Sequence, residues 1–341
     1  MRARTPLWLV LPPLALAAFG SVLRAEPPRS NAAAEAAIRQ VESERQRAQV
    51  TPAPPAAQDS SAESTNPQLY PGESEDLGPQ FLLIRKQRKR LFEASADVQY
   101  YYTSNFFLSE KGNVDTGVLA TTAQVAFCPE PFRIGIGELG LRTGYRHQTF
   151  YYGLDSTENQ FNNLDFDSET VFFNARYKLP KDYVAFVGLD YGRLLSHEFE
   201  RTEFFTELAV SWGLEKSIPI GEKNQLSFAY IGSEHFTYSD PAPTTNTGDR
   251  TDSIFALSWS SMLTSKLSAQ PYYRFQHTHY WFDDNRNDFV HAVGISLSFA
   301  LSETSSIRFF SGFDVRNSDT EAVDDYHKFD TGGGISISYR F

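Results

Sequence analysis

The sequence predicts an all-β fold, an up-and-down antiparallel β-barrel of about twelve strands that follows a disordered N-terminal extension. Three observations lead to this prediction. From residue 92 to residue 341, apolar and polar residues alternate with a period of two, as they do when the two faces of a strand meet different environments. The connections between the alternating segments are short and long in turn. The last segment, "GGGISISYRF", again carries apolar residues at every second position.

The composition limits the function classes. The chain has 341 residues with 28 Phe and 17 Tyr, yet its mean hydropathy is −0.39, so apolar residues must be dispersed among polar ones. A net charge of −11 argues against a nucleic-acid partner, which needs basic patches. The single cysteine, Cys128, can form neither an intrachain disulfide nor a metal cluster, and it reads as apolar filler or as a free thiol. We expect no cofactor and no metal.

Residues 1–25 predict a signal peptide. A basic start, "MRAR", precedes the apolar stretch "PLWLVLPPLALAAFG", which is too short and too rich in proline to be a spanning helix. Cleavage after Ala25 fits this pattern, and we therefore expect the protein to be exported.

Residues 26–90 predict a linker. The stretch "NAAAEAAIRQVESERQRAQV" favours helix, and the Pro- and Ser-rich stretch after it favours disorder. The helical stretch could alternatively self-associate, although isolated helices of this length are marginal. The basic junction "RKQRKR" is either solvated or in contact with anionic lipid headgroups.

The strands follow from period-two alternation. In the first of them, Val98 and Tyr100 share one face while Asp97 and Gln99 share the other. Because short connections alternate with longer polar ones, both ends of the barrel chain are expected on the short-turn side. The predicted strands lie within residues 92–102, 119–127, 138–148, 169–179, 183–192, 204–215, 225–232, 252–262, 267–281, 289–299, 306–316 and the terminal segment.

Strand length indicates where the apolar faces go. About ten residues at roughly 3.3 Å each, tilted by about 40°, cross an apolar band near 25 Å thick. A soluble β-sandwich would hide its apolar face against a second sheet. A closed barrel leaves no unpaired edge, which hydrocarbon does not tolerate. The alternation over residues 91–341 therefore predicts a transmembrane barrel.

The terminal residues Phe341, Tyr339, Ile337 and Ile335 resemble the C-terminal insertion signal of bacterial outer-membrane β-barrel proteins of the Gram-negative type. The resemblance covers residues 91–341 in architecture, and only the last strand carries a specific motif. It implies location in the outer membrane, contact with outer-membrane lipid, recognition by the barrel assembly machinery and a periplasmic position for residues 26–90. The fold by itself does not specify a function.

Strand parity predicts which side chains line the lumen. The charges expected there either crosslink the wall as ion pairs or line a pore that selects solutes. The predicted lumen-lining residues are Arg142, Arg146, Arg176, Arg274, Arg308, Arg316, Glu93, Asp97, Glu138, Asp190, Glu207 and Asp314.

Small and aromatic residues on the same face have opposite implications. Ser258, Ser260, Ala292, Gly294, Ser296, Gly334 and Ser336 could leave room for water. They could equally make room for inward Phe172, Phe186, Phe205, Tyr272 and Phe310, which are the main reason to doubt an open path.

Catalytic and metal motifs are weak. The outer-membrane phospholipase family uses a His, a Ser two residues later and a nearby Asn at the lipid-facing rim. "HQT" offers His147 and Thr149, with Asn159 further along, but Thr replaces Ser.

Two further segments have polar residues at suggestive spacings. His277 and His279 share one strand face next to Trp281, where a belt at headgroup level is favoured over a metal site. "DDNRND" begins like a calcium loop at Asp283, but it lacks the required Gly and Glu.

The sequence therefore favours a passive, porin-like channel for small polar or anionic solutes, with a mild anion preference set by the inward arginines. The alternatives are a non-conducting structural or surface-binding barrel and, with less support, a lipid-modifying enzyme. We expect that the protein is not an enzyme.

Overall fold

The computed structural model describes residues 90–111, 113–154, 164–197, 201–239, 248–282, 285–321 and 323–341. The predicted signal peptide, the linker before residue 90, Asn159 and Asp283 lie outside the described residues and stay predictions. No helix within the described ranges is long and apolar enough to cross a membrane.

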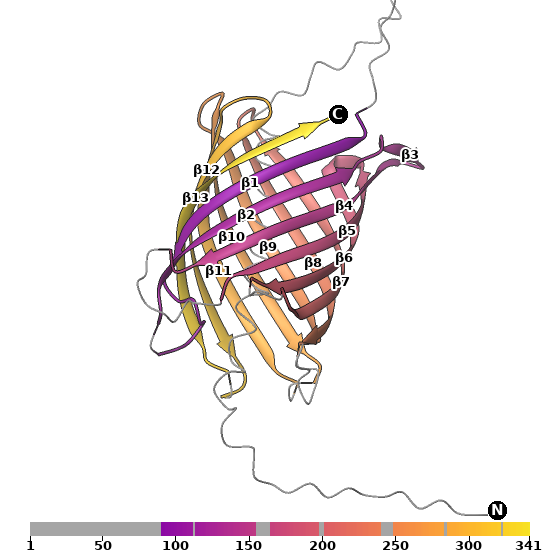
Figure 1. Ribbon diagram of the computed structural model, residues 1–341. Coiled ribbons are helices and arrows are strands. Elements are labelled where there is room, and N and C mark those ends of the chain that lie inside the picture. The colour runs from indigo at the N-terminus through magenta and orange to yellow at the C-terminus, as the bar shows by residue number, and fades with distance from the viewer. Residues whose placement is uncertain are drawn as a thin grey trace, which may run out of the picture.

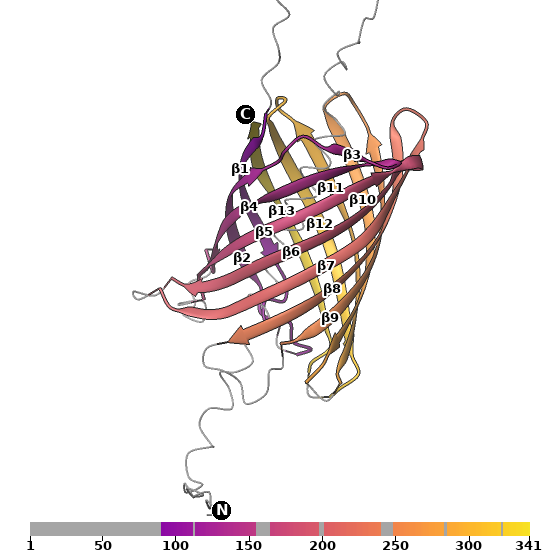
Figure 2. The same ribbon diagram turned by 90° about the vertical axis from the view of Figure 1, so that its right-hand side faces the viewer.

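The fold is a closed antiparallel β-barrel, as the sequence predicts (Figure 1). Its strands are β1 (Phe92–Thr103), β2 (Thr116–Phe127), β3 (Phe132–Ile134), β4 (Gly137–Tyr152), β5 (Phe166–Leu179), β6 (Tyr183–Ser196), β7 (Glu203–Ile220), β8 (Asn224–Ser239), β9 (Arg250–Met262), β10 (Leu267–Tyr280), β11 (Asn287–Ala300), β12 (Ser305–Ser318) and β13 (Tyr326–Arg340). Figure 2 shows their common tilt around the wall.

The ring closes through β1 and β2. Strand β1 pairs with both β2 and β13, and β2 pairs with β4. The three-residue strand β3 pairs only with the beginning of β4, so it belongs to the connection between β2 and β4, and the other twelve strands form the wall. A short 3₁₀ turn, η2 (Pro180–Asp182), connects β5 to β6 on the same side of the barrel as the C-terminus, which we call the short-turn end. We call the opposite end the loop end.

The two strand faces differ in chemistry. One face carries exposed, large apolar side chains and is the outer face; the other is the inner face. Examples on the outer face are Val98, Tyr100, Val125, Val171, Phe173, Leu189, Trp212, Phe228, Phe255, Val293, Phe309 and Ile335. An apolar outer surface on a barrel without free edges is the arrangement that hydrocarbon requires of spanning strands.

Strand β8 is longer than the sequence predicts. The sequence placed residues 233–239 in a polar loop, but they continue the strand, and Leu208 pairs with Phe236. Phe236 and Tyr238 keep the outer parity, whereas Glu234 and His235 obscure it in the sequence. Pairing with both β7 and β9 sets the strand end here, and that pairing is not visible in local composition.

The seam between β1 and the end of the chain is closed by backbone and rings together. The amide of Phe341 donates to the carbonyl of Phe92 at 2.8 Å, and the amide of Phe92 donates to the carbonyl of Phe341 at 2.9 Å. The two rings stack with centroids 6.1 Å apart, and Tyr339 stacks on Phe341 at the same distance. Phe341 therefore completes the ladder that removes the barrel's edge.

Removal of Phe341 is expected to weaken the closed barrel. It deletes two backbone hydrogen bonds, worth about 2 kcal/mol together, along with the ring contacts of Phe92 and Tyr339. Urea unfolding in lipid vesicles and gel mobility without heating measure the loss. Phe341→Leu, which keeps both backbone bonds, should lose less. An unchanged unfolding midpoint after removal would contradict this role.

Candidate functional site

The candidate site is the inner wall of the barrel. The twelve residues predicted to line the lumen stand on the strand face opposite to the exposed apolar side chains. For example, Asp190 lies between the exposed Leu189 and Tyr191 along β6.

Several inner charges form ion pairs. Arg142 contacts Glu93 at 2.6 Å, and the pair bridges strands β4 and β1 across β2. Arg176 contacts Glu215 at 2.5 Å across β6. Asp314 lies 3.7 Å from Lys328. The first two pairs crosslink strands that are not adjacent, whereas Asp314 and Lys328 are in register on the adjacent strands β12 and β13.

A denser network fills the inner face of β7–β9 toward the loop end. Glu207 accepts a hydrogen bond from Arg250 at 3.0 Å, and its Oε1 lies 2.8 Å from Nδ1 of His235. Nε2 of His235 lies 3.2 Å from Asp252, which also faces Nε of Arg250 at 3.6 Å. These four side chains neutralise one another away from bulk water, which buried charges require.

The sequence prediction missed part of this wall. The sequence predicts Glu207 but not Arg250 and His235, because the predicted strands end too early at the loop end; Asp252 lies within the predicted strand 252–262 but is not among the predicted lumen-lining residues. Lys328 and Asp330, 3.2 Å apart on β13, are also absent from the predicted lumen-lining residues. Asp288 was also missed; it lies 3.9 Å from the predicted Arg316. Extending the parity of each strand by a few residues would have found them.

Inward aromatic rings lie against glycines of the neighbouring strand. Phe172 is in register with Gly144, and its ring tip lies 2.8 Å from where a Cβ on that glycine would be. Phe186 stands opposite Gly213 in the same way, at 2.5 Å. Tyr272 stands opposite Gly294 and also reaches Gly312 on the next strand. Glycine thus lets these rings pack along the wall.

Arginines cover the rings in turn. The guanidinium carbon of Arg142 lies 5.5 Å from the ring centre of Phe172, and that of Arg176 lies 5.6 Å from Phe186. Arg308 lies over Phe310 at 5.6 Å. Such cation–π contacts contribute about 0.5–2 kcal/mol each. They keep the aromatic side chains and the arginines together at the wall.

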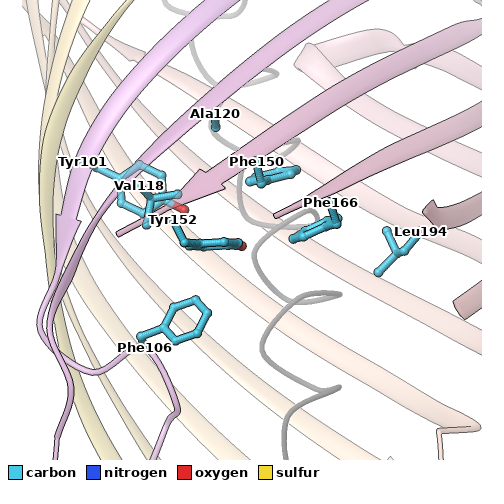
Figure 3. Close-up of a cluster of buried hydrophobic side chains, with 8 residues drawn as sticks. All are labelled: Tyr101, Phe106, Val118, Ala120, Phe150, Tyr152, Phe166 and Leu194. Carbon is cyan, nitrogen blue, oxygen red and sulfur yellow. The ribbon is translucent and has the colours of Figure 1, made fainter. Parts of the chain in front are cut away.

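An apolar cluster occupies the inner face at the loop end of β1–β6 (Figure 3). Phe150 and Phe166 are in register and stack with centroids 4.7 Å apart. Phe106, from the connection between β1 and β2, packs against Tyr152 at 4.7 Å. The cluster consists of Tyr101, Phe106, Val118, Ala120, Phe150, Tyr152, Phe166 and Leu194. It narrows the barrel at this end from one side.

The middle of the inner wall is different. Small inner residues on three neighbouring strands are only partly buried, although they lie inside the ring. They are Ser211 and Gly213 on β7, Ser227 and Ala229 on β8, and Ala256 and Ser258 on β9. These residues place little side-chain volume on this part of the inner face.

The weak motifs fall on the outer face. The hydroxyl of Thr149 donates to Asp167 at 2.8 Å and lies 3.4 Å from Nε2 of His147. His277 and His279 both contact Oδ1 of Asn287, at 3.1 and 3.0 Å. No group of His, Cys, Asp and Glu within the described ranges is arranged to hold a metal ion.

Comparisons with known proteins concern the fold. No protein-family model matches the chain, and no curated protein sequence matches it. An outer membrane channel from Pseudomonas putida F1 is 8% identical, with 74% of this chain and 97% of that chain covered at a TM-score of 0.48. The β-domain of the Bordetella autotransporter BrkA is 11% identical, with 74% and 100% covered at 0.43. The KdgM porin is 9% identical, with 72% and 99% covered at 0.36.

The closed twelve-stranded wall and its apolar outer face define the class. The chain has the fold of an outer-membrane β-barrel protein. The structures that it resembles belong to the same class, and their functions differ.

Arg250→Met is expected to destabilise the barrel by about 3–5 kcal/mol, because Glu207 and Asp252 would then share one imidazole. Arg176→Met is the matched control. Its side chain is 43% exposed, against 15% for Arg250, so its loss should cost less than about 1 kcal/mol. Urea titration of both variants in vesicles measures the difference. Equal losses would show that the network is no more tightly coupled than a surface ion pair.

Proposed function

We propose that the protein is a narrow passive channel for small polar solutes. The observation that carries the proposal is the set of small, partly exposed inner residues on β7–β9, such as Ser227 and Ser258. A polar wall around space that side chains do not fill holds water, and water-filled space is what a polar solute needs.

The packing of the inward rings supports the same proposal. The large side chains of Phe172 and Phe186 are a reason to doubt an open path through the barrel, but their rings rest on glycines of the wall. We expect the narrow part of the path at the loop end, between the apolar cluster around Phe150 and the opposite ion network around Arg250. A constriction of this kind implies small conductance steps.

Charge selectivity should be weak. The inward arginines alone would favour anions, but Arg142, Arg176 and Arg316 each have a carboxylate within ion-pair distance. Paired charges leave a smaller net field in the lumen than a stripe of one sign. The anion preference expected from the sequence is therefore retained only as a mild one.

Single-channel recording in planar bilayers tests the proposal, with Tyr272 as the probe. A Cβ at Gly312 would lie 3.0 Å from the Tyr272 hydroxyl and 3.6 Å from the nearest backbone atom, so Gly312→Ala should shift that ring from the wall and lower the conductance. Tyr272→Ala should raise the conductance and should restore it in the Gly312→Ala background. Gly140→Ala is the matched control, because its Cβ would meet nothing closer than 3.9 Å.

The non-conducting barrel is the competing outcome. If purified, folded protein gives no steps, and neither Tyr272→Ala nor Phe310→Ala opens any, the channel proposal fails. A structural or surface-binding barrel then takes its place.

A further inference from the structure

The outer face changes character toward the loop end of β4–β7. Tyr145, Val171, Tyr191 and Leu208 stand side by side in register and form an exposed apolar row. Rows at this level and nearer the short-turn end continue the apolar surface of the barrel. This row is the last fully apolar one on these four strands.

The next row on the same face is polar. Two residues further along each strand, about 7 Å away, stand His147, Glu169, Arg193 and Thr206, again in register. Because side chains repeat with a period of two, this polar row faces the same way as the apolar row beside it. Beyond it, Thr149 pairs with Asp167. The resulting outer polar cluster consists of His147, Thr149, Asp167, Glu169, Arg193, His197 and Arg201.

Two carboxylates organise the outer polar cluster. Asp167 accepts from Thr149 at 2.8 Å and from Arg201 at 2.6 Å, and its Oδ1 lies 2.9 Å from His197. Glu169 accepts two hydrogen bonds from Arg193, at 2.8 Å from Nε and 2.6 Å from Nη2. These hydrogen bonds hold Arg193 and Arg201 in place.

The most exposed groups of the outer polar cluster are its two guanidinium groups. The side chains of Asp167 and Glu169 are 7% and 14% exposed, whereas those of Arg193 and Arg201 are 46% and 53% exposed. Nη2 of Arg201 makes both of its carboxylate contacts; its Nη1 and Nε contact no acceptor among the described residues. Nη1 of Arg193 lies 3.7 Å from Glu203, whose side chain is 42% exposed, so a molecule approaching this face meets that carboxylate as well as the guanidinium and imidazole groups.

Its position limits what can approach. An arginine on the lipid face costs about 2–4 kcal/mol at the middle of the bilayer and about 0–1 kcal/mol near the interface. Tyr151, whose ring packs edge-on against His197 at 5.4 Å, has the amphipathic character typical of the interface. The outer polar cluster is thus at headgroup level, where phosphate groups are the available anions.

We propose that the outer polar cluster binds a phosphate group carried by a lipid headgroup in the leaflet at the loop end. Guanidinium N–H groups match phosphate oxygens, and charge-assisted hydrogen bonds of this kind are the strong ones. The geometry favours binding over acyl transfer. Thr149 is buried and donates its hydroxyl to Asp167, while His147 at 3.4 Å is outside good hydrogen-bond range. This proposal does not depend on whether the lumen conducts.

Native mass spectrometry of the folded barrel in detergent tests the binding, with purified lipid A as the phosphate-bearing lipid. The wild type should retain lipid A in preference to phosphatidylethanolamine. The double variant Arg193→Gln with Arg201→Gln should bind it at least about tenfold more weakly, as expected for the loss of charge-assisted hydrogen bonds. Gel mobility without heating verifies that each variant is folded.

Two further variants distinguish a specific lipid A site from nonspecific attraction between cations and the anionic lipid. Lys216→Gln removes an outer-face cation at the short-turn end, where its ammonium lies 4.2 Å from the ring centre of Tyr183, and should leave lipid A binding unchanged. Asp167→Asn removes a negative charge but also an acceptor that holds Arg201, so it should bind lipid A no more tightly than the wild type.

Four results would overturn the proposal. They are equal binding by the double variant, an equal loss in Lys216→Gln, tighter binding by Asp167→Asn, and displacement of lipid A by inorganic phosphate at matched concentration. The last of these would point to a site for free phosphate rather than for a lipid headgroup.

Discussion

The structure depends on one constraint, that a backbone crossing hydrocarbon must pair every N–H and C=O within the protein. A sheet meets this constraint only when its first and last strands join. Here the reciprocal bonds between Phe92 and Phe341 and the register from Glu93 to Thr103 complete that seam. Closure then fixes the two faces, because period two sends alternate side chains outward to lipid and inward to the lumen.

The inner wall of this barrel accommodates large side chains against its backbone. Glycines such as Gly144 and Gly213 admit the rings of Phe172 and Phe186 against the backbone, and arginines pack over those rings. The same wall is closed more tightly toward the loop end, by the apolar cluster on one side and by ion pairs on the other. A narrow path with weak selectivity is the function that this division supports best.

The sequence predicts the fold well because parity is a local property. Strand existence, the two faces and the inward placement of Arg142 or Asp97 all follow from alternation alone. The partners of these side chains do not follow from alternation, because they depend on the register between strands. Arg250 contacts Glu207 across β8, and Tyr272 is in register with Gly294 on β11. Strand ends are also set by neighbours, which is why residues 233–239 have the composition of a loop although they continue β8. The "HQT" motif contains His147 and Thr149, but Asp167 lies beside them only because β4 pairs with β5.

The central claim is that the inner face encloses water while the outer face meets lipid, and thiol labelling in lipid vesicles tests it most directly. Cys128 is buried, and burial raises the pKa of its thiol; replacing it with Ala gives a clean background. In that background, Ser258→Cys on the inner face should react with a membrane-impermeant maleimide, and the adjacent Leu257→Cys on the outer face should not. Labelling at residue 257 with none at residue 258 would contradict the assignment of the two faces, and labelling at neither would contradict a water-filled lumen.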